Sequence, residues 1–83
     1  MPLYYFHLDG DGVSRDEDGS ELKDLEAAKC TAVQLIAETL CYQPHKFWDA
    51  DSYKVTVTDE KGLVLFIVEM VATLSAAVPA RRR

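Results

Sequence analysis

Residues 53–68 read YKVTVTDEKGLVLFIV, and this stretch decides the fold. Residues 53–58 alternate between apolar and polar side chains, which predicts a strand with one buried face and one face in solvent. The run Leu63–Val68 is apolar at every position, which is typical of a strand covered on both sides. Because Asp59 and Gly62 lie between the two runs and favour a tight turn, we expect an antiparallel hairpin here.

A second hairpin is expected at the beginning of the sequence. Residues 3–8 contain three consecutive aromatic side chains and predict a strand. An acidic turn with Gly10 and Gly12 follows, and it leads into a short strand at about residues 13–17. Because Val13 is the only large apolar residue of that strand, we expect it at an edge of the sheet.

One amphipathic helix is expected between the hairpins, from about Leu25 to Tyr42. Asp24 can accept a hydrogen bond from the first turn as the N-cap, and Pro44 prevents the helix from continuing. An apolar stripe along the helix predicts the face that packs on the sheet. Its members are Leu25, Ala28, Ala32, Leu35, Ile36 and Leu40. The connection at residues 43–51 carries aromatic side chains that are expected to fold back over the core.

These elements predict an α+β fold of order ββαββ, with two β-hairpins in one mainly antiparallel sheet and a single long helix packed on one face. Because residues 3–8 and 63–68 are apolar on both faces, we expect them side by side in the middle, with sheet order 2-1-4-3 when the strands are numbered along the chain. Residues 1–70 would form one domain. Residues 71–83 would form an extension, with a short helix at about 70–78 and then a frayed arginine tail. The sheet face without a helix needs a cover, from this extension or from a second copy.

Composition limits the classes of function. The chain has 83 residues, is 48% hydrophobic and carries a net charge of -5. A core of this size leaves a small stability margin, and self-association is a common remedy, so a homodimer is expected. The acidic balance disfavours nucleic acid, although Arg81, Arg82 and Arg83 leave contact through the tail as an alternative. The sequence has no signal-peptide pattern and no apolar run of about 20 residues, which predicts a cytoplasmic protein that does not span a membrane.

The two cysteines suggest a contact surface rather than a reactive site. Cys30 and Cys41 are eleven positions apart on the expected helix, about 16 Å along its axis, which is too far for a disulfide. We expect them to be reduced. Together with Val33 and Ala37 they form a second apolar stripe, which is a possible dimer contact between helices.

No residue pattern predicts catalysis or a bound metal. His7 and His45 are not at zinc-ligand spacing, and the acidic turns do not fit the calcium-loop template, although weak cation binding by Asp9, Asp11, Asp16 and Asp18 remains open. A phosphate-binding glycine loop and a nucleophile elbow are also missing, so we expect no enzyme and no cofactor. A ligand pocket near Tyr5, His7 and Trp48 is the alternative site.

Three segments resemble one family. They are Met1–His7, Arg15–Ala28 without Lys23, and Val57–Leu65. Together they are similar to the small bacterial proteins grouped as domain of unknown function 6894, over about residues 2–70. The resemblance implies a shared single-domain fold and brings no activity, ligand or catalytic residue.

The sequence therefore favours a non-enzymatic, homodimeric protein-interaction or regulatory module. Two alternatives stay open. One is a small-ligand or metal sensor with a pocket near His7, and the other is a nucleic-acid contact through the arginine tail.

Overall fold

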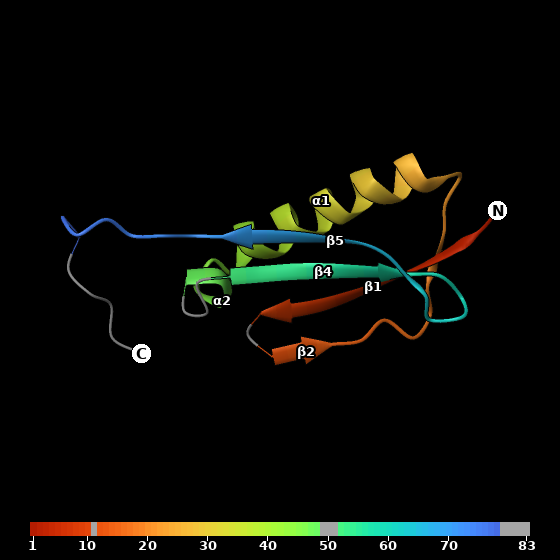
Figure 1. Ribbon diagram of the computed structural model, residues 1–83, viewed down its shortest axis with the longest axis horizontal. Coiled ribbons are helices and arrows are strands. Elements are labelled where there is room, and N and C mark those ends of the chain that lie inside the picture. The colour runs from red at the N-terminus through yellow and green to blue at the C-terminus, as the bar shows by residue number, and fades with distance from the viewer. Residues whose placement is uncertain (11, 49–51, 79–83) are drawn as a thin grey trace.

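The computed structural model describes residues 1–10, 12–48 and 52–78, and it has the expected α+β architecture. Its elements are β1 (Leu3–Gly10), β2 (Gly12–Ser14), β3 (Ser20–Glu21), α1 (Leu25–Tyr42), α2 (His45–Trp48), β4 (Ser52–Thr58) and β5 (Val64–Val71). The strands form one sheet in the order β2-β1-β4-β5, and β3 also pairs with β1 (Figure 1). Every pair is antiparallel. Two hairpins joined through one long helix thus build the sheet.

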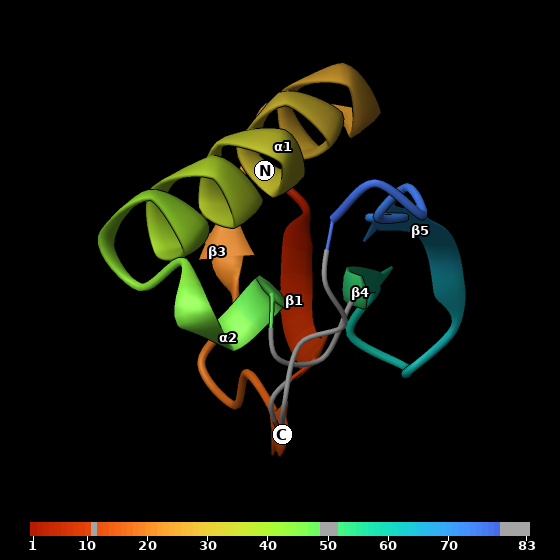
Figure 2. The ribbon, with the colours of Figure 1, turned by 90° about the vertical axis from the view of Figure 1, so that its left-hand side faces the viewer.

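Helix α1 has the bounds that its sequence signals predict. The Asp24 carboxylate accepts a hydrogen bond from the Ala27 N–H at 2.9 Å, as an N-cap does. The helix lies across one face of the sheet (Figure 2). Its buried residues are Ala28, Ala32, Ile36 and Leu40, and Leu35 packs partly against them. Leu25 is 41% exposed, so its place in the buried stripe was wrong.

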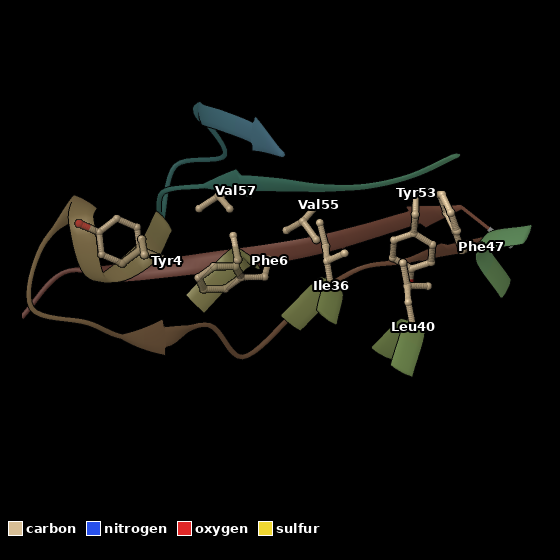
Figure 3. Close-up of a cluster of buried hydrophobic side chains, with 10 residues drawn as sticks. Tyr4, Phe6, Ile36, Leu40, Phe47, Tyr53, Val55 and Val57 are labelled. Carbon is tan, nitrogen blue, oxygen red and sulfur yellow. The ribbon is translucent and has the colours of Figure 1, made fainter. Parts of the chain in front are cut away.

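The core lies between α1 and the inner face of β1 and β4 (Figure 3). Val55 and Val57 of β4 are completely buried at its centre, and Phe6 of β1 lies beside them. Phe47 of α2 is also buried, next to Tyr53, so this aromatic side chain folds back over the core as expected. Trp48 is exposed instead, and residues 49–51 of this connection lie outside the described residues. The inner surface that holds the domain together therefore comes mostly from β1, β4 and α1.

The expected strand order was wrong. Strand β4 lies in the middle and pairs with both β1 and β5, while the apolar strand β5 lies at the edge. An antiparallel strand needs only one buried face to be central, and Val55 and Val57 give β4 that face. The apolar positions of β5 are mostly exposed instead.

Two further expectations were wrong at the ends of strands. The second strand does not run over residues 13–17, because residues 15–19 leave the ladder as a turn and pairing resumes only at β3. Residues 70–78 form no helix, since β5 continues to Val71 in register with β4. After β5 the chain makes a single turn, in which the Val78 N–H donates to the Ser75 carbonyl at 3.1 Å.

The glycine turns are confirmed. Gly12 has φ 94° and Gly62 has φ 85°, the left-handed region that glycine adopts without strain. The Asp59 carboxylate accepts hydrogen bonds from the Lys61 and Leu63 N–H groups at 2.8 and 3.0 Å, which fixes the hairpin between β4 and β5.

Candidate functional site

His7 lies in the middle of β1 on the sheet face opposite α1, and both of its ring nitrogens are engaged. Nδ1 accepts a hydrogen bond from the Asp16 backbone N–H at 3.2 Å, and Nε2 lies 3.2 Å from the Thr58 hydroxyl oxygen. Because Nδ1 is an acceptor, a neutral ring carries its proton on Nε2 and donates it to Thr58. The imidazole is therefore fixed between the edge turn and β4.

Asp16 holds the edge of the sheet together. One carboxylate oxygen accepts from the Phe6 N–H at 3.1 Å, and the other accepts from the Asp18 and Gly19 N–H groups at 3.1 and 3.0 Å. Partial burial acts to raise the pKa of Asp16, but the hydrogen bonds from Gly19, Phe6 and Asp18 and the nearby His7 outweigh it, so the pKa lies below its ordinary value. These contacts make Asp16 a structural carboxylate.

A shallow pocket of about 240 Å³ lies beside His7. Its lining residues are Tyr5, His7, Arg15, Asp16, Thr58, Asp59, Glu60 and Gly62. Two of the acids, Asp16 and Asp59, are already occupied by backbone N–H groups. The groups left to meet a ligand are the Tyr5 hydroxyl, the Arg15 guanidinium and the Glu60 carboxylate. The volume is below the range of about 300–1,000 Å³ that is typical of small-molecule sites.

The structure separates the residues of the predicted ligand pocket. Tyr5 and His7 both line the pocket, but Trp48 is not among its lining residues. Trp48 lies on α2, where its ring meets Phe47 edge to face at 5.1 Å. Arg15 and Thr58 also line the pocket, and no pattern in the sequence singles them out, because only the pairing of β1 with β4 and the turn after β2 bring them there.

The second apolar stripe of α1 is exposed along its length. Cys30 and Cys41 are free and exposed, and Val33 and Ala37 are exposed as well. Val33 and Ala37 face a groove between α1 and β5, whose volume is about 270 Å³. Its other lining residues are Ile36, Leu40, Val68, Glu69 and Met70, so it is almost entirely apolar. The two cysteines do not line it.

Strand β5 carries the largest group of exposed apolar side chains. On and next to it, Leu63, Val64, Leu65, Ile67, Met70 and Val71 are all exposed. The side chains of Phe66, Val68 and Met70 share the face of Tyr53, Val55 and Val57, toward α1, because these residues are register partners. Ile67 and Val71 therefore face the other side, beside Thr56 and Ser52. Both faces of the strand thus present apolar surface.

This edge was missed by sequence reasoning, and the signal was available. The same apolar run that predicted a central strand is also typical of an edge strand that pairs with another chain. Periodicity gives the character of each face, but it does not say which neighbour covers that face.

Among residues 1–10, 12–48 and 52–78, no group of three or more histidine, cysteine, aspartate or glutamate side chains could hold a metal ion. In the same part of the chain, no helix is long and apolar enough to cross a membrane. Two of the predicted contacts fall outside the described residues: cation binding by Asp11 and nucleic-acid binding by Arg81–Arg83.

Comparison with known proteins identifies the family alone. No curated protein and no solved structure matches the chain. A family model matches residues 3–72. This range includes every helix and strand described above, and only the turn at residues 75–78 lies outside it. The chain therefore belongs to the family described as Domain of unknown function (DUF6894).

Proposed function

We propose that this chain is a non-enzymatic, homodimeric protein-interaction module whose contact surface is formed by β5 and the adjacent side of α1. The observation that carries the proposal is the exposed apolar surface of β5, where Ile67 is 54% exposed and Val71 is 64% exposed. Contiguous apolar surface of this kind on a small protein marks a contact with another molecule. A domain of 83 residues also gains stability from such a contact.

The polar residues support a structural role rather than catalysis. Three of the titratable groups that line the pocket, His7, Asp16 and Asp59, are each bound to backbone or to a neighbouring side chain. A general base needs a free lone pair directed at a substrate. These side chains hold turns and strands instead.

The proposal includes a reducing, cytoplasmic location. Cys30 and Cys41 are both free and exposed on one helix. Exposed thiols are kept reduced in the cytoplasm, whereas a secreted domain of this size usually relies on disulfides.

Sedimentation velocity and light scattering test the proposal, over concentrations from the low micromolar to the millimolar range. We expect the mass of a dimer, with dissociation on dilution. A monomer at every concentration would contradict self-association. Addition of a reductant serves as the control, because a dimer that disappears with reductant would be an artefact of the exposed cysteines.

A small-ligand sensor is the second candidate, supported by the pocket that Tyr5, His7 and Arg15 line. The guanidinium and the phenol would bind a small carboxylate or phosphate compound. A thermal-shift screen of such compounds and of divalent metals tests it, with Arg15→Gln as the matched variant. A stabilisation that Arg15→Gln removes would support the sensor, and no response in the wild-type protein would exclude it.

A further inference from the structure

We propose that β5 pairs antiparallel with β5 of a second copy, about a two-fold axis at Val68, so that one sheet runs through the dimer. This inference rests on the proposed function and names its contact. Strand β5 has eight residues, an edge of about 26 Å at about 3.3 Å per residue. Among the described residues it pairs with β4 alone, so its other side presents unpaired backbone N–H and C=O groups.

A second copy suits this edge for reasons of symmetry and charge. An antiparallel pair of identical strands is self-complementary under a two-fold axis, so each donor of one copy meets an acceptor of the other. Glu69 is the only charged residue between Val64 and Val71, and Lys54 lies opposite it on β4. Two copies that each carry a net charge of -5 can therefore approach most closely along this nearly neutral strand.

The register follows from the irregularity in β5 and from Glu69. The ladder shifts between Val57 and Thr58, so only the part from Phe66 onward keeps regular alternation with β4. A two-fold axis at Val68 places Val68 opposite its own copy and Phe66 opposite Met70, all on the inner face. An axis at Glu69 would instead place two carboxylates directly opposite each other, which is unfavourable.

A neighbouring axis, at Ile67, fails for a different reason. It would place Met70 opposite Val64, and these side chains lie on different faces, since Val64 pairs with Thr58 and Met70 pairs with Tyr53. Opposite residues in a sheet share a face. The Val68 axis also brings Phe66 and Met70 of the second copy beside the groove between α1 and β5, and so covers its open side.

Charge substitutions at Ile67 test the surface and the register together. In the proposed register Ile67 lies opposite Glu69 of the other copy. Ile67→Glu should therefore make the protein monomeric, because each of the two symmetric contacts with Glu69 becomes repulsive. Ile67→Lys makes both contacts attractive, so its dimer dissociation constant should be roughly tenfold lower than that of Ile67→Glu. Val13→Glu on β2, at the opposite edge of the sheet, is the control, since Val13 is 72% exposed and lies outside the proposed contact. We expect Val13→Glu to leave the dimer intact.

Disulfide trapping gives a second readout that does not depend on affinity. In a Cys30→Ser, Cys41→Ser background, Val68→Cys should form a covalent dimer on oxidation, because opposite Cα atoms lie about 4.5–5.5 Å apart. Glu69→Cys should not, since the register separates the two copies of residue 69 by more than the about 7 Å limit. Circular dichroism of each variant checks that it is folded.

The outcomes separate this inference from the proposed function. A wild-type dimer that Val33→Glu disrupts and Ile67→Glu leaves intact would overturn β5 pairing and keep the interaction module, with α1 as the contact. Efficient trapping at residue 69 but not at residue 68 would overturn the register. A wild-type monomer at every concentration would overturn both proposals and leave another protein's strand as the partner of β5.

Discussion

The two edges of this sheet are built in opposite ways. At the first edge, β2 has three residues and β3 has two, and the turn between them carries Asp16, whose side chain takes up the Phe6 N–H. At the second edge, β5 has eight residues, a single charge and apolar side chains on both faces. Short strands and inward-pointing charges prevent further pairing, and a long apolar edge invites it. The difference supports β5 as the proposed contact with other molecules.

The protected edge depends on side chains rather than on a continuous ladder. Strand β2 pairs with residues 8–10 of β1, and β3 pairs with residues 3–4. Between these two paired segments, side chains take the place of a strand. The Asp16 carboxylate accepts a hydrogen bond from the Phe6 N–H, and the His7 ring accepts one from the Asp16 N–H. Removing one of these side chains should therefore open the protected edge.

The largest effect should come from Asp16→Ala. The substitution leaves the N–H groups of Phe6, Asp18 and Gly19 without their acceptor, and we expect the free energy of unfolding to fall by about 3 kcal/mol. Urea denaturation followed by circular dichroism measures it. Asp18→Ala in the same turn is the control, and it should change stability by less than about 0.5 kcal/mol because Asp18 is exposed. Equal losses in both variants would contradict the special role of Asp16.

Gly19→Ala should destabilise the same edge by about 2 kcal/mol. Gly19 has φ 75°, where a side chain costs about 1–2 kcal/mol, and an added Cβ would lie 3.0 Å from the Tyr5 ring. Gly12→Ala is the matched control, because Gly12 also has positive φ but has open space around it. Thermal unfolding of the pair separates backbone strain from contact with the ring. A loss at Gly12 as large as that at Gly19 would mean that Tyr5 does not restrict the turn.

The acid dependence of the protected edge should follow the Asp16 pKa. This pKa is lower in the folded protein than the ordinary value of 3.8, so the carboxylate stabilises the fold fully above pH 3.8 and loses this contribution as the pH falls through the folded pKa. We therefore compare Asp16→Asn with the wild-type protein in urea denaturation from neutral pH downward. The variant should be less stable by about 1 kcal/mol at neutral pH, and the difference should close below pH 3.8. A difference that is constant with pH would contradict this assignment.

Local signals in the sequence predicted most of the fold. The bounds of α1 followed from Asp24 and Pro44, and the hairpin turns followed from glycines that adopt positive φ. The protected edge was harder to predict, because a strand pattern at residues 13–17 gave no sign that the Asp16 side chain would replace the ladder. The position of β5 was also missed, since a run that is apolar on both faces fits a central strand as well as an edge that binds a second chain.

The candidate sites were predictable only in part, for a related reason. Tyr5 and His7 line one pocket because they are two apart on β1 and so share a face. Trp48 follows a helix and a turn, and no short-range pattern fixes where such a side chain lies. Val33 and Ala37 reach the groove beside β5, but the groove itself forms only because α1 lies over β4 rather than over the edge.

The smallest effect on the fold should come from the open edge. Threonine keeps the β-branched shape that favours a strand, so Ile67→Thr should change the free energy of unfolding of the dilute monomer by about 0.5 kcal/mol or less. Val57→Thr is the control on the inner face, and it should cost about 2 kcal/mol because Val57 is completely buried and its hydroxyl would lack a partner. Urea denaturation at a concentration below dimerisation measures both variants. A loss at Ile67 equal to that at Val57 would mean that β5 contributes its apolar face to the monomer core. A negligible loss at Ile67 would mean that the monomer folds without an apolar side chain at residue 67. Association with a second copy would then be the physical role of Ile67.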